Sequence, residues 1–186
     1  MGISTLIKTL TASGDSSLSF VDGTADVTLD STYDEYMWVF TDIGPATNDV
    51  DFSFQVNATD DAGGGYDTSL ITSTYWVNYN NEGSSQNDVA YVAAMDLAQS
   101  SNFQILADSV SNAADHSVAG IFHLFSPSST TYVKHFYSRI ISNHINDYSY
   151  DEFVAGYIND TTAIDEIQFK MSSGNFDGVI QMYGIS

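Results

Sequence analysis

Histidine is the side chain that most readily exchanges protons near neutral pH, and two of the four histidines flank one turn-like segment. His123 and His135 lie on either side of the segment PSSTT (127–131). A hairpin here would place both imidazoles on neighbouring strands, where they could bind a metal or shuttle protons. We favour the alternative, a hydrogen-bonded pair that packs within a sheet or an interface. His116 and His144 show no partner spacing of this kind.

Carboxylates are abundant, with 24 aspartates and glutamates in the chain. At this density, pairs at glycosidase-like separations arise by chance, so they do not indicate catalysis. The segment NATDDAGGGYD (57–67) offers Asp60, Asp61 and Asp67 as oxygen ligands for Ca²⁺. It does not match the spacing of an EF-hand loop, and a solvated turn is the favoured interpretation. We therefore expect no resident cofactor or metal.

Signatures of nucleophilic catalysis are missing from the sequence. It contains no cysteine, and none of its serines lies in a G-x-S-x-G motif. We therefore expect a protein without enzymatic activity. Aromatic side chains remain as binding candidates because they can stack on sugar rings, although packing in the interior or between subunits is the favoured alternative. The candidates for stacking are Tyr66, Tyr75, Trp76 and Tyr79.

The charge balance excludes two classes of partner. Only four lysines and arginines oppose the acids, which gives a net charge of −20. Such a surface repels nucleic-acid phosphates and anionic bilayers, so we expect no direct binding to nucleic acid or membrane. The first residues do not resemble a secretory signal, and no apolar run has the length of a membrane-spanning helix, so we expect a protein made in the cytoplasm.

Short apolar or alternating runs recur along the chain and are separated by Gly, Asn, Asp and Ser. The run VDFSFQVNA (50–58), for example, alternates apolar and polar residues with the period of a half-buried strand. Alanines in the segment 88–107 favour one helical turn or a short helix near 89–98. The pattern as a whole predicts an all-β fold, an antiparallel, jelly-roll-like β-sandwich of about eight to ten strands. We expect residues 1–12 to form an N-terminal strand or arm and residues 13–186 a single β-sandwich domain.

Several predicted strands carry apolar residues on both faces, namely the runs 36–40, 121–125, 136–141 and 179–185. A strand in a sandwich with one core should have one polar face. The second apolar face therefore needs a cover, either a loop of the same chain or a neighbouring subunit. The residues predicted for a subunit interface lie near the two ends of the chain: Ile3, Leu6, Ile7, Tyr183 and Ile185.

Four long stretches together resemble one group of proteins. They are MGISTLIKTLTASG (1–14), YMWVFTDIGPAT (36–47), FHLFSPSSTTYVKHFYSR (122–139) and AIDEIQFKMSSGNFDGVIQMYGI (163–185). These stretches resemble small virion structural proteins of marine bacteriophages, and the resemblance spans most of the chain. It transfers no catalytic residues.

The resemblance implies a component of a virus particle, a capsid decoration protein or a part of a tail or fibre. We expect a non-enzymatic capsid decoration or cement protein that assembles through its apolar strand faces, as a homotrimer in contact with other virion proteins. The alternative is a tail-fibre or receptor- and carbohydrate-binding module, which would present exposed tyrosine or tryptophan along a shallow groove. An enzyme would instead need two or three carboxylates that converge in a cleft.

Overall fold

The computed structural model describes residues 4–61, 65–66 and 68–186. These residues form a 12-stranded antiparallel sheet and one short 3-10 turn, Ala93–Met95. The strands are β1 (Ser4–Asp15), β2 (Ser17–Val21), β3 (Glu35–Pro45), β4 (Val50–Ala58), β5 (Ile71–Asn81), β6 (Asn87–Tyr91), β7 (Gln104–Val110), β8 (Val118–Phe125), β9 (Lys134–His144), β10 (Tyr148–Ile158), β11 (Ile164–Met171) and β12 (Phe176–Ile185).

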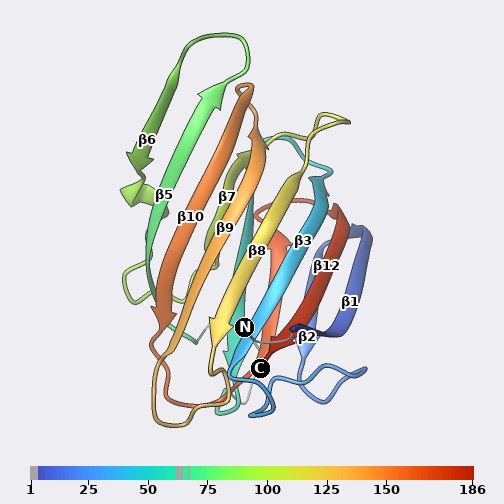
Figure 1. Ribbon diagram of the computed structural model, residues 1–186, viewed down its shortest axis with the longest axis vertical. Helices are drawn as coiled ribbons and strands as arrows, with labels where there is room; N and C mark the ends of the chain where they lie inside the picture. Colours follow the sequence, from blue (N-terminus) through green and yellow to red (C-terminus); the bar gives the residue numbers. More distant parts are fainter. Residues whose placement is uncertain (1–3, 62–64, 67) are drawn as a thin grey trace.

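The sheet folds into two layers that face each other (Figure 1). The front layer contains, in spatial order, β6, β5, β10, β9, β8, β3, β12 and β1, and the back layer contains β7, β4, β11 and β2. The sheet forks at β9, which pairs along its length with β10 and joins β7 only at the pair Val110–His144. Strands β1 and β2 are consecutive in the chain and lie at the two ends of the longest path through the sheet, so the sandwich is nearly closed into a barrel. The predicted all-β sandwich class is confirmed.

The number of strands exceeds the predicted eight to ten because β6 and β7 lie in the segment where alanines favoured a helix. Only the single 3-10 turn Ala93–Met95 forms there. Strand β6 pairs with β5, and β7 pairs with β4. These sheet contacts override the weak local preference of the alanines for helix.

Strand β1 pairs with β12 from Ser4 to Asp15, so the described part of the predicted N-terminal strand lies in the sheet. The division of the chain into residues 1–12 and 13–186 stays a prediction.

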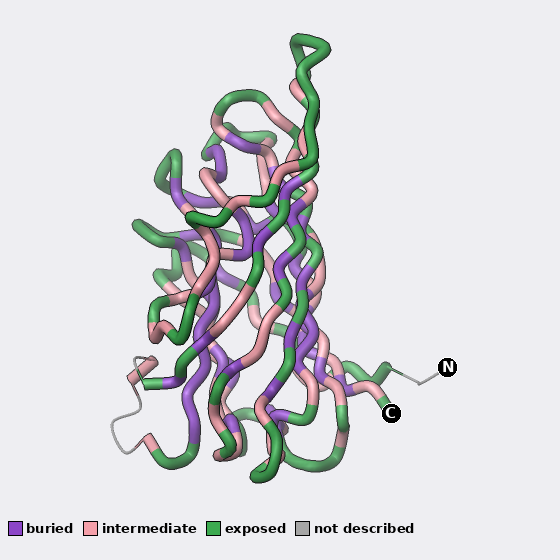
Figure 2. The backbone as a smooth tube through the Cα atoms, turned by 90° about the vertical axis from the view of Figure 1, so that its left-hand side faces the viewer, coloured by how far each residue is buried: buried purple, intermediate pink, exposed green. Residues whose placement is uncertain are grey.

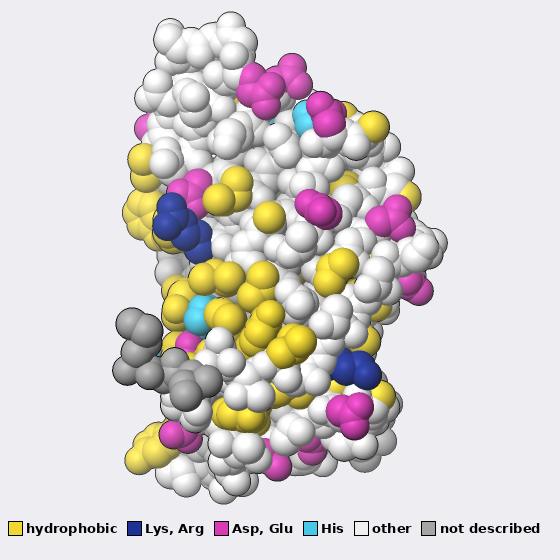
Figure 3. All heavy atoms as spheres, turned by 45° about the vertical axis from the view of Figure 1, so that its right-hand side comes forward, with side chains coloured by type: hydrophobic (Ala, Val, Ile, Leu, Met, Phe, Trp, Pro, Cys, Tyr) yellow, Lys and Arg dark blue, Asp and Glu magenta, His cyan; other side chains and the backbone are white. Residues whose placement is uncertain are grey.

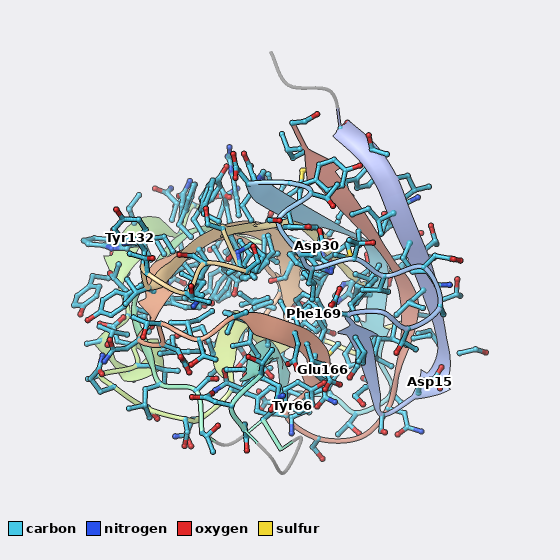
Figure 4. The ribbon with its side chains drawn as sticks, turned by 90° about the horizontal axis from the view of Figure 1, so that it is seen from below. Asp15, Asp30, Tyr66, Tyr132, Glu166 and Phe169 are labelled. Carbon is cyan, nitrogen blue, oxygen red and sulfur yellow. The ribbon has the colours of Figure 1, made fainter. Side chains whose placement is uncertain are left out.

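The core lies between the layers, where Figure 2 shows buried positions in purple, and it is rich in aromatic rings. Phe169 of β11 lies near its middle (Figure 4) and is within 6.5 Å, measured between ring centroids, of rings from both layers. Edge-to-face packing of this kind stabilises a core beyond simple burial of area. Near the end of the chain, Ile180 and Met182 are buried as the alternation predicts, so β12 is a central part of the fold.

Gly174 occupies the turn between β11 and β12 with a φ of +74°, as its place in the turn predicts. A Cβ atom there would also meet Thr47 Oγ1. We therefore expect Gly174→Ala to lower the free energy of unfolding by about 1–2 kcal/mol in urea denaturation. Gly83→Ala is the matched control, since the nearest atom to its added Cβ is Asn81 Oδ1 at 3.7 Å. Equal unfolding midpoints for the two variants would contradict the expectation.

One buried glutamate links the two layers close to the fork. Glu152 of β10 is fully buried, and its carboxylate accepts hydrogen bonds from the Tyr75 hydroxyl (2.5 Å), the Ser142 hydroxyl (2.9 Å) and the backbone N–H of Asp108 (2.7 Å). These partners lie on β5, β9 and β7, so one side chain ties three front strands to the back layer. Burial raises the pKa of Glu152 to about 8, against the opposing effect of the three hydrogen bonds.

Candidate functional site

The strands with apolar residues on both faces are neighbours in the front layer. They are β8, β9, β3 and β12, and they lie side by side in the order β9, β8, β3 and β12 (Figure 1). Their inward residues, such as Trp38 and Phe122, are completely buried in the core. Their outward residues therefore share one broad exterior surface, the outer side of the front layer.

Two adjacent rows of paired residues cross this exterior and define what we call the front face. The first row consists of Leu6, Tyr183, Met37, His123, Tyr137, Ala155 and Thr74. The second row consists of Thr9, Gln181, Val39, Ile121, Arg139, Phe153, Trp76 and Tyr91.

Large apolar side chains of the front face remain exposed to solvent. Leu6 and Tyr91 are 50% exposed, Trp76 is 46% exposed, and Tyr137 and Phe153 are about 40% exposed. Figure 3 shows hydrophobic side chains gathered in the left and centre of the view, on the β3, β12 and β1 side of the molecule, with most acidic side chains around them. Contiguous apolar surface of this kind is typical of a site that contacts another molecule.

Charged groups on and beside the front face are paired. Neither row contains an aspartate or glutamate, and the two nearest acids, Glu35 and Asp151, lie on adjoining rows. Glu35 is hydrogen-bonded to Nδ1 of His123, whose ring stacks on Tyr137 with 4.6 Å between centroids. Asp151 accepts two hydrogen bonds of 3.0 Å from Arg139. The front face is therefore nearly neutral on a chain of net charge −20.

A small hollow of about 120 Å³ opens between β5, β9 and β10. Trp76, Tyr137 and Phe153 line it with Ala155 and Val154, so its walls are mostly apolar. The guanidinium of Arg139 lies over the Phe153 ring, 5.1 Å from its centroid. The hollow fits an apolar side chain better than a sugar, because a sugar needs several convergent hydrogen-bonding groups.

The residues predicted for a subunit interface fall into three groups. Ile3 lies outside the described residues. Leu6, Tyr183 and Ile185 are on the exterior of the front layer, with the last two half-buried. Ile7 is partly buried and packs against the core of its own chain.

The four predicted stacking aromatics do not form one platform. Trp76 is exposed on the front face, whereas Tyr75 is 1% exposed because alternate residues of β5 point to opposite sides. The prediction for Tyr75 is therefore wrong. Tyr66 lies outside the back layer, where its hydroxyl is hydrogen-bonded to Ser19 and Glu166; Figure 4 shows Tyr66 and Glu166 side by side. The ring of Tyr79 packs against Tyr148 and Tyr150.

The predicted calcium ligands are only partly described. Asp67 lies outside the described residues. Asp60 accepts a hydrogen bond from the Thr162 hydroxyl, and Asp61 accepts one from the Thr68 hydroxyl. Within residues 4–61, 65–66 and 68–186, no three His, Asp or Glu side chains are grouped as a metal site would require. A Ca²⁺ ion bound by the loop 57–67 stays a prediction.

His123 and His135 do not face each other as a regular hairpin would place them. The register of β8 and β9 sets His123 opposite Tyr137, while His135 lies opposite Tyr157 of β10. The favoured interpretation, a hydrogen-bonded pair of these two histidines, is not what forms, because His123 is hydrogen-bonded to Glu35 and stacks on Tyr137 instead.

A second hollow, of about 370 Å³, lies away from the front face. Its polar lining includes Asp42, Asp115, His116 and Asp177, from the loop 112–117 and the adjoining ends of β3 and β12. Three carboxylates, those of Asp42, Asp115 and Asp177, border this hollow. The Asp and His side chains of this hollow are not grouped closely enough to hold a metal ion.

Phe153, Tyr91 and Tyr137 belong to the candidate surface but were not predicted from the sequence. Tyr91 lies on β6, which has no buried residue and therefore gave no signal. Phe153 and Tyr137 belong to runs of alternating residues whose inward members are core, and that alternation was the available signal. It could not be used without knowing which strands are neighbours.

The described residues include no helix with the length and apolar character needed to cross a membrane. No protein-family model and no curated protein matches this sequence.

Proposed function

We propose that this chain is a non-enzymatic structural protein of a bacteriophage virion, a capsid decoration or cement protein that is held in the particle through its front face. The observation that carries the proposal is the exposed apolar surface of the front layer. Trp76, Phe153 and Leu6 are among its members, and they lie on strands whose other faces already fill the core. Covering such side chains with a neighbouring protein removes apolar surface from water, which stabilises the complex.

The partners in this proposal are other virion proteins and further copies of the chain, assembled as a homotrimer. The protein would be made in the host cytoplasm and used in the virion. The resemblance of four long stretches to marine phage virion proteins supports this role. The net charge of −20 argues against a role that requires direct contact with packaged DNA.

Binding to particles tests the proposal. We expect purified protein to co-sediment with phage particles that lack it, and to reach a fixed number of copies per particle. Phe153→Glu should reduce this binding at least tenfold, because it replaces an apolar ring by a carboxylate that must lose its water in the contact. Thr24→Glu, an exposed site in the turn after β2, is the control with the same added charge. The proposal fails if the wild-type protein does not bind, or if Phe153→Glu binds as well as Thr24→Glu.

A carbohydrate-binding module of a tail fibre is the second candidate, and one observation favours it. The Trp76 and Tyr91 rings lie 5.0 Å apart and are both about half exposed. Such a pair can stack on sugar rings. If this candidate is correct, a glycan array should show binding that Trp76→Ala abolishes. A wild-type protein that binds no glycan on the array would exclude it.

A further inference from the structure

We propose that a second copy of this chain covers the front face in a head-to-tail manner, in which two different halves of the face meet. We define the Trp76 half as Trp76, Tyr91, Phe153 and Tyr137, and the Leu6 half as Leu6, Tyr183, Met37, Val39 and Ile121. The Trp76 half of one protomer packs on the Leu6 half of the next, and the series closes into a ring. The number of copies in the ring, three, is taken from the proposed function, and in this respect the inference rests on it.

Charge selects the front face as the place where two copies meet. The chain has 24 acids and four lysines and arginines, so two copies repel each other across most of their surfaces. The two rows of the front face contain no acid. The acids beside them are already neutralised by Arg139 or hydrogen-bonded to His123. Two strongly acidic copies can therefore approach closely where both present this face.

The shapes of the two halves favour a contact between the Trp76 half of one copy and the Leu6 half of the other. The Trp76 half contains the apolar hollow of about 120 Å³, and hollows lined by tryptophan, tyrosine and phenylalanine are typical centres of binding energy in interfaces. The Leu6 half carries Leu6 on an outer strand with half of its surface exposed. A protruding aliphatic side chain is a suitable occupant for such a hollow.

Curvature of the front layer favours closure into a ring. Seen along the strands, the layer is an arch with β5 and β6 at one side and β12 and β1 at the other (Figure 4). The two halves therefore face different directions. Rotational assemblies larger than a dimer use two such different patches on each subunit, whereas a two-fold dimer uses one patch twice.

Mixing two damaged variants tests this arrangement. Light scattering coupled to size exclusion, at micromolar concentration, should give the wild-type protein three times the protomer mass of 20.2 kDa. Trp76→Glu and Leu6→Glu should each be monomeric, because every contact needs one Trp76 half and one Leu6 half. Their equimolar mixture should give a species of two protomers, since one intact half of each kind remains. Thr24→Glu should keep the wild-type mass.

The proposal is overturned if the mixture stays monomeric, if either variant alone keeps the wild-type mass, or if the wild-type protein is itself a monomer. Tyr91→Glu and Tyr183→Glu form a second pair with the same logic, should either first variant fail to fold. Co-sedimentation with particles separates this inference from the proposed function. A monomer that binds particles refutes only the ring, and a ring that does not bind particles refutes only the structural role in the virion.

Discussion

Replacing Glu152 by alanine is expected to lower the free energy of unfolding by about 3–5 kcal/mol at pH 6, one of the two largest effects of a single substitution in this chain. The change removes the acceptor of three hydrogen bonds, from Tyr75, Ser142 and the backbone of Asp108. These donors lie in or beside the core and would lose their partner without gaining water. The substitution also leaves a cavity where the two layers are joined.

Glu152→Gln should behave in the opposite way because it keeps the shape of the side chain. Its carbonyl can accept from Tyr75 and Asp108, and its amide can donate to the Ser142 hydroxyl. The folded protein holds the pKa of Glu152 at about 8, above the ordinary value of 4.5. The stability that the protonated carboxyl contributes is therefore full below pH 4.5 and is lost as the pH rises towards 8. Glutamine does not titrate and should be free of this loss.

Urea unfolding followed by tryptophan fluorescence between pH 5 and pH 9 measures both effects. Relative to Glu152→Gln, the wild-type protein should lose about 3–5 kcal/mol over this range. Comparing the two proteins cancels the titration of distant groups that they share, whereas Asp108, whose pKa burial raises to about 6, interacts with Glu152 and contributes to the difference. Parallel stability curves for wild type and Glu152→Gln would show that Glu152 is ionised in the folded protein throughout.

Phe169→Ala is expected to cost about 3–5 kcal/mol, because it empties the middle of the core. The Phe169 ring is fully buried, and its closest aromatic neighbour is Phe40, 5.1 Å away between centroids. Strands of both layers meet around it, and their rings cannot close the space without moving the backbone. Phe169→Leu fills most of the volume and should cost about 1.5 kcal/mol.

Tyr132→Ala is the control for this core variant, since it removes an aromatic ring that is 72% exposed and projects from the edge of the molecule (Figure 4). It should change the free energy of unfolding by less than about 0.5 kcal/mol. Chemical denaturation of the three variants gives the comparison. Similar losses for Phe169→Ala and Tyr132→Ala would mean that the interior rings do not carry the stability of the fold.

Alternation of apolar and polar residues was enough to predict most of the strands. The run 50–58 became β4 with Phe52, Phe54 and Val56 fully buried in the core, as predicted. The expectation of a half-buried strand is wrong, because its polar side, with Ser53 and Gln55, is buried as well. Alternation failed between 88 and 107, where β6 is a short edge strand with mostly exposed residues and little core of its own. For such a segment, the partner strand decides the structure, and the sequence does not identify the partner.

The sequence predicted that a second apolar contact surface exists, but it did not predict where on the fold this surface lies. Apolar residues on both faces of the run 36–40 indicated a second contact surface, and the exposed rows of the front layer are its structural counterpart. The location depended on which strands are neighbours. Tyr75 and Trp76 illustrate this limit of prediction from sequence. They are adjacent aromatic residues, yet Tyr75 is buried in the core and Trp76 is exposed on the front face.

Strands that are apolar on both sides also leave their alignment weakly specified. Sliding β3 by one residue would exchange Met37 with Trp38 and keep the middle of the strand apolar, so the hydrophobic pattern opposes the slip only at Glu35 and Thr41, which would turn towards the core. Pairing of Glu35 with His123, and of Arg139 with Asp151, is possible only when β3, β8, β9 and β10 are correctly aligned. These polar pairs therefore favour the native register of the strands over shifted ones during folding. This role is additional to keeping the surface neutral.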